Sequence, residues 1–157
     1  MTTFIKQYEQ TFPVLTTINL PVTKASGAAP TTAYSIAVAN VQAGDLLAIT
    51  GKTQVTNNLH KAPFFSKSNN VGVGSYLSYI DGQGAHQTIT FPTGGNVDAV
   101  MHHATRQEAT VWEVPQGVSG TVTICFRLQS AALQAKANWA LRVDQGYGNL
   151  RIKHERP

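Results

Sequence analysis

Apolar and polar residues alternate with a period of two through most of this chain. The clearest case is the segment 121–129, in which Val122, Ile124, Phe126 and Leu128 share one parity. Successive side chains of a strand point to opposite faces of a sheet, so this pattern predicts a strand with one buried face.

Similar segments predict eight to ten short strands. They are residues 14–20, 34–38, 45–55, 71–80, 87–91, 97–105, 110–114, 121–129, 139–143 and 150–152. Asp81-Gly82 is a hairpin signal, and Gly146-Tyr147-Gly148 predicts a turn between the last two strands. Short strands at this spacing, separated by Gly, Pro, Asn and Ser, predict an all-β fold, an antiparallel β-sandwich or jelly roll.

Two segments depart from this pattern. Near the N-terminus, Phe4, Tyr8 and Phe12 stand four residues apart, with Ile5 beside Phe4. This spacing predicts a short helix or arm with an apolar face, which either covers the chain's own sandwich or packs on a neighbouring subunit. The segment 130–138 is rich in helix formers and predicts a short helical link.

The length of 157 residues indicates one domain. We expect an N-terminal arm at residues 1–13 and a single β-sandwich domain at residues 14–157. A chain of this size buries about 70% of its unfolded surface, and therefore needs no disulfide to stabilise its core. Its single cysteine, Cys125, lies in an apolar run and is expected to be a buried thiol.

Charged residues make up 13% of the chain, about half of the usual 25%. An uncharged polar surface suits packing between subunits, because few ions must be desolvated. The net charge is +4, but the twelve Lys and Arg residues are dispersed, so nucleic-acid binding is not favoured. No signal-peptide pattern or membrane-spanning apolar stretch is present. We therefore expect synthesis in the cytoplasm, no membrane insertion, and a final place in a virion or on a particle surface.

His102 and His103 are the candidate metal ligands. Adjacent residues of a regular strand point to opposite faces, so the two would share one metal only at a bulge. A metal site would also need ligands from elsewhere, such as His60 or Asp98. The alternative is one histidine in the core and one on the surface.

Three aromatic residues are candidates for stacking on a sugar ring. They are Trp112, Tyr76 and Tyr147, of which the two tyrosines lie near predicted turns. For Trp112, the alternative is a place in the core.

No motif for catalysis is present. The chain has no nucleophile elbow and no phosphate-binding glycine loop, and no motif pairs carboxylates such as Asp98 and Glu113. We expect a protein that is not an enzyme and has no cofactor.

One partial resemblance concerns the last third of the chain. The stretch Val111-Trp-Glu-Val-Pro-Gln-Gly-Val-Ser-Gly-Thr-Val-Thr-Ile124, with Trp139-Ala-Leu-Arg-Val143, resembles the last strands of small cytoplasmic bacterial galactose-binding lectins. The resemblance implies a jelly roll. Those lectins are calcium-dependent tetramers, but the loop that begins at Leu128 lacks their Asp/Asn cluster, so no functional residue is carried over.

These observations favour a non-catalytic structural protein. The leading hypothesis is a subunit of a virion, in a phage capsid, decoration or tail, or of another surface assembly. It would form symmetric homo-oligomers, of which a trimer is one form, and would contact other assembly subunits. The alternative hypothesis is a carbohydrate-binding, lectin-like module of the soluble bacterial type, with glycans as partners.

Overall fold

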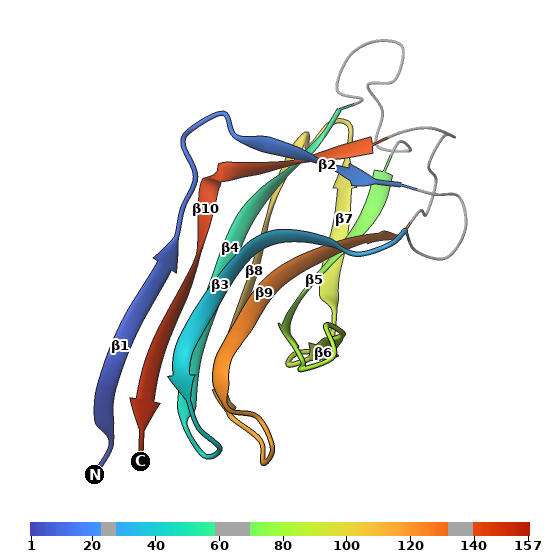
Figure 1. The fold of residues 1–157 in the computed structure, drawn as a ribbon. Coiled ribbons are helices and arrows are strands. Elements are labelled where there is room, and N and C mark those ends of the chain that lie inside the picture. Colours follow the sequence, from blue (N-terminus) through green and yellow to red (C-terminus); the bar gives the residue numbers. More distant parts are fainter. Residues whose placement is uncertain (23–27, 59–69, 132–139) are drawn as a thin grey trace.

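The computed structural model of this chain consists of β-strands and their connections (Figure 1). It describes residues 1–22, 28–58, 70–131 and 140–157. Ten strands form two five-stranded antiparallel sheets, and the described residues contain no helix. None of them therefore belongs to a helix that could cross a membrane. The predicted all-β sandwich is confirmed.

The two sheets are named sheet A and sheet B. Sheet A contains β1 (Thr3–Gln10), β2 (Thr17–Pro21), β4 (Leu46–Asn57), β8 (His103–Glu113) and β10 (Ala140–Arg156). Sheet B contains β3 (Thr31–Val41), β5 (Asn70–Ile80), β6 (His86–Thr88), β7 (Thr93–Asp98) and β9 (Gly120–Ala131). Sheet A has the order β1-β10-β4-β8, with β2 beside the first half of β10. The chain termini lie next to each other at the ends of β1 and β10 (Figure 1).

The core lies between the sheets and follows the predicted alternation. Val122, Ile124, Phe126 and Leu128 of β9 are all buried. Opposite them, β4 contributes Leu47, Ile49 and Val55, and β10 contributes Leu141, Val143, Leu150 and Ile152. Gly51 interrupts the inward row of β4 because a Cβ there would lie 2.9 Å from the Phe126 ring. Phe126 therefore occupies the space that a side chain at position 51 would fill.

The N-terminal segment is an extended arm and not a helix. Residues Thr3–Gln10 pair with β10, so the arm is an edge strand of sheet A. A bulge between Phe4 and Lys6 shifts the register, so Phe4 does not face the same side of the sheet as Tyr8. The four-residue spacing of the aromatic residues therefore does not produce one apolar stripe.

The last strand is continuous where the sequence predicts a turn. β10 runs from Ala140 to Arg156, with a shift in register between Asp144 and Asn149. The prediction of a turn at residues 146–148 is wrong, because both glycines serve close packing. A Cβ at Gly146 would lie 2.5 Å from the Pro13 carbonyl, and a Cβ at Gly148 would overlap the Lys52 carbonyl.

The predicted strand 97–105 is instead divided by a turn. The Asp98 carboxylate accepts hydrogen bonds from the backbone N–H groups of Val100 and Met101, at 2.8 and 2.6 Å, which ends β7. β8 then begins at His103. The predicted hairpin at Asp81 is confirmed, since β5 and β6 pair across it. Residues 132–138 of the predicted helical link lie outside the described residues.

Candidate functional site

A polar depression lies on the outer face of sheet A, opposite the core. Its volume is about 450 Å³. The register places Thr17, Asp144 and Gln54 side by side on β2, β10 and β4. Thr56 and His103 are paired on β4 and β8. Four neighbouring strands thus contribute to one surface, which is lined by Leu15, Thr17, Gln54, His102, His103, Arg142, Asp144 and Tyr147.

The Asp144 carboxylate forms the floor of the depression and is 3% exposed. Its Oδ1 accepts a hydrogen bond from Arg142 Nε at 2.6 Å. Its Oδ2 accepts one from Gln54 Nε2 at 3.0 Å and another from the Thr56 hydroxyl. A buried carboxylate needs such partners to offset the loss of hydration. Asp144 therefore fixes the positions of three polar side chains, and its charge balances that of Arg142.

The two histidines lie together at one wall of the depression. His102 has a left-handed backbone, with φ of 66°, at the end of the turn between β7 and β8. Its backbone carbonyl accepts a hydrogen bond from Asn57 N–H at 2.7 Å. The ring centroids of His102 and His103 are 3.9 Å apart. The expectation that they point to opposite faces fails because His102 precedes the regular strand.

The Nδ1 atoms of the two histidines have different neighbours. The His103 Nδ1 lies 2.7 Å from the Thr56 hydroxyl oxygen and 3.2 Å from the Gln54 amide nitrogen. The His102 Nδ1 lies 3.1 Å from the Asn57 carbonyl oxygen, which only accepts. The described residues contain no group of three or more His, Cys, Asp and Glu side chains that could hold a metal ion. Metal binding by these histidines stays a prediction.

The three aromatic candidates lie in different places. Tyr147 is 53% exposed and lines the depression. Tyr76 is buried on sheet B, where its hydroxyl accepts a hydrogen bond from Arg127 at 3.2 Å. Trp112 packs on Tyr79 with ring centroids 4.8 Å apart. The structure therefore brings Tyr147 together with His102 and His103, but not with the other two aromatics.

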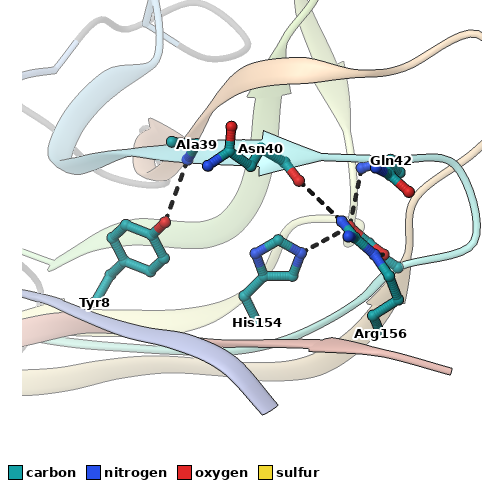
Figure 2. Close-up of polar contacts among 7 residues, drawn as sticks. Tyr8, Ala39, Asn40, Gln42, His154 and Arg156 are labelled. Atoms are coloured by element: carbon teal, nitrogen blue, oxygen red, sulfur yellow. Dashed lines mark hydrogen bonds and ion pairs between the residues drawn. The ribbon is translucent and has the colours of Figure 1, made fainter. Parts of the chain in front are cut away.

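The arm residues divide between the core and the surface. Tyr8 and Phe12 pack against the core, and Tyr8 also accepts a hydrogen bond from Ala39 N–H at 3.3 Å (Figure 2). Gln10 accepts a second one from Ser35 N–H at 2.7 Å. The arm thus covers the edge of β3 in its own sandwich, whereas Phe4 and Ile5 are exposed.

A separate cluster of charged groups joins the end of β10 to the β3–β4 turn. Figure 2 shows His154 and Arg156 pointing toward this turn. The buried Asp45 carboxylate accepts hydrogen bonds from Arg156 Nε and His154 Nε2, both at 2.7 Å, and from Gln42 N–H at 2.9 Å. Arg156 above all, with His154 and Gln42, holds the pKa of Asp45 far below its ordinary value. Asp45 and His154 are buried and the Arg156 side chain is a third exposed, so the cluster ties the end of β10 to the β3–β4 turn.

The sequence analysis did not identify Gln54, Thr56, Arg142 and Asp144 as site residues. Gln54 and Thr56 occupy alternate polar positions of β4, and Arg142 and Asp144 do so in β10. The alternation of apolar and polar residues therefore predicts that these side chains face away from the core. Their convergence depends on the pairing of β4 with β10, which links residues about 90 positions apart, and nothing in the local pattern specifies it.

Comparisons with known proteins find similarity of fold. No protein-family model and no curated protein sequence matches the chain. The chain is similar to VP2 of infectious bursal disease virus in a subviral particle, with a TM-score of 0.57 and 12% identity. The match covers 94% of this chain and 32% of VP2, so this chain spans about a third of that protein. VP2 of the Gt strain of the virus is matched with a TM-score of 0.45 and 11% identity, over 99% of this chain and 37% of VP2. The enzymatically active domain of bacteriophage CBA120 tailspike protein 4 is matched with a TM-score of 0.37 and 11% identity, over 95% of this chain and 19% of that chain.

Proposed function

We propose that this chain is a non-catalytic structural domain of a virus or phage particle, where it forms a symmetric homo-oligomer such as a trimer. The observation that carries the proposal is its sandwich fold, which over 94% of the chain is similar to that of VP2 in a subviral particle. A fold hosts many functions, so the surface must also suit assembly.

The surface of sheet A supports this proposal. Near the end of β8, Val111 and Ala109 pair with the uncharged residues Ala48 and Thr50 of β4, which on their other side pair with Lys153 and Arg151 of β10. Val111 is exposed there, and Phe4 of β1 is 55% exposed. Exposed apolar residues on edge strands are typical of sites where another chain packs.

The test is the oligomeric state of the full chain, measured by sedimentation velocity and light scattering. We expect a defined oligomer that dissociates when Phe4→Asp and Ile5→Asp are combined, because two charges would be buried in the contact. These changes leave the pairing of β1 and the contacts of Tyr8 intact, unlike a deletion of residues 2–12. The matched control is Phe91→Asp, which changes an exposed aromatic residue outside β1.

A monomeric wild-type chain at high concentration would contradict self-assembly. If neither the double change nor the Phe91→Asp control dissociates the oligomer, the arm is not part of the interface. The proposed location is tested by looking for the protein, in fixed stoichiometry, in particles purified from the source.

A further inference from the structure

The depression on sheet A combines apolar walls with a polar floor. Tyr147 is 53% exposed and Leu15 is 82% exposed, although both are large apolar side chains. The floor below them contains the carboxylate of Asp144, the guanidinium of Arg142 and the amide of Gln54. A concave site with a few converging polar groups is typical of small-molecule binding.

The backbone around the depression is held in costly conformations. The described residues contain three non-glycine residues with positive φ, and two of them, Leu15 at 76° and His102 at 66°, line this depression. Such conformations are strained for residues other than glycine and tend to occur at functional sites. Gly146 and Gly148 bring Tyr147 to the wall by allowing β10 to pass close to Pro13 and Lys52. The apolar wall is therefore built by specific local structure.

The charges and donors of the site indicate its ligand. Asp144 and Arg142 neutralise each other in a 2.6 Å ion pair, so the floor has no excess positive charge for a phosphate group. Saccharide hydroxyls both donate and accept hydrogen bonds, and the apolar face of a sugar ring packs on an aromatic ring. We propose that this depression binds a saccharide, a function that goes beyond assembly.

The residues have distinct roles in this site. The Tyr147 ring packs on the sugar face. Within the described part of the chain, Arg142 contacts Asp144 through Nε alone, and its terminal nitrogens carry four further N–H donors for ring hydroxyls. Asp144 is a positioning residue, because its oxygens accept hydrogen bonds from Arg142, Gln54 and Thr56.

The experiment is a glycan array of neutral and sialylated oligosaccharides probed with the full chain, followed by calorimetric titration of the best oligosaccharide. We expect a defined set of saccharides to bind. Tyr147→Ala and Arg142→Gln should each weaken binding by about tenfold or more, as expected for the loss of a stacking ring or a charged donor. Inorganic phosphate should not compete.

Two variants serve as matched controls. Arg151→Gln removes another arginine from the outer face of β10, one that pairs with Glu9, and Phe91→Ala removes an exposed aromatic ring elsewhere. Both should bind like the wild type. Arg142→Gln also removes the ion-pair partner of Asp144, so unfolding curves of all variants are recorded to check that each is folded. Tyr147→Ala tests the site without changing this ion pair.

Three results would overturn the proposal. The first is no binding by any saccharide at millimolar concentration, and the second is binding that both Tyr147→Ala and Arg142→Gln leave unchanged. The third is binding of phosphate in place of sugar. The oligomer test above uses other residues, so either idea can fail without the other.

Discussion

Asp45 is the residue whose removal should most weaken the joint between β10 and the β3–β4 turn. Its carboxylate is buried and accepts hydrogen bonds from Arg156 twice, at 2.7 and 2.9 Å, from His154 at 2.7 Å and from Gln42 N–H at 2.9 Å. Asp45→Ala would leave the fully buried His154 ring without this acceptor. It would also leave the Arg156 guanidinium without its counter-charge.

Breaking a buried ion pair from one side costs about 3–5 kcal/mol. The side chain of Arg156 is a third exposed and regains part of its hydration, so we expect the lower end, about 3 kcal/mol. For a chain of this length this corresponds to a fall in Tm of about 6–12 °C. The matched control is Glu9→Ala, which removes the exposed ion pair with Arg151 and should cost about 0.5 kcal/mol or less.

The measurement is urea unfolding of the wild type and both variants between pH 3 and pH 7. The folded pKa of Asp45 is depressed, so its contribution is fully present above about pH 4, the ordinary value of an unfolded aspartate. It is lost as the pH falls below that value toward the folded pKa. The stability difference between wild type and Asp45→Ala should therefore be constant near neutrality and narrow in acid. A loss at pH 7 no larger than that of Glu9→Ala, or a difference that grows in acid, would refute the reasoning.

Three further predictions concern other parts of the sandwich. Gly148→Ala should cost about 2–3 kcal/mol, because its Cβ would overlap the Lys52 carbonyl; Gly82→Ala, with open space around it, is the control in the same unfolding assay. Tyr34→Phe should cost about 1–2 kcal/mol, because the Tyr34 hydroxyl donates to the buried Gln145 carbonyl at 2.6 Å; an unchanged midpoint in urea would contradict this. Cys125 is buried and burial raises the pKa of its thiol, so a thiol reagent should label it slowly in the native state and fast in urea; equal rates would show that the site opens readily.

The alternation of residues predicted the strands well because burial acts on each strand locally. In β9 the predicted inward row of Val122 to Leu128 is the row that lines the core. Glycine was less informative, since it permits both turns and close backbone contacts. The sequence around Tyr147 was interpreted as a turn, but Gly146 and Gly148 instead let one continuous strand pass two neighbours.

The candidate site was harder to predict because it depends on which strands are neighbours. The candidates Tyr147, His102 and His103 were chosen from the sequence for different reasons, as an aromatic platform and as metal ligands. They meet in one depression because β4 lies between β8 and β10. The residue that organises it, Asp144, appears in the sequence as an ordinary polar residue that follows the apolar Val143. Its importance follows from burial on the outer face of the sheet, where the side chains of three other polar residues must satisfy it. A buried carboxylate on the outer face of a sheet is thus a more specific sign of a site than the exposed aromatics that first suggested one.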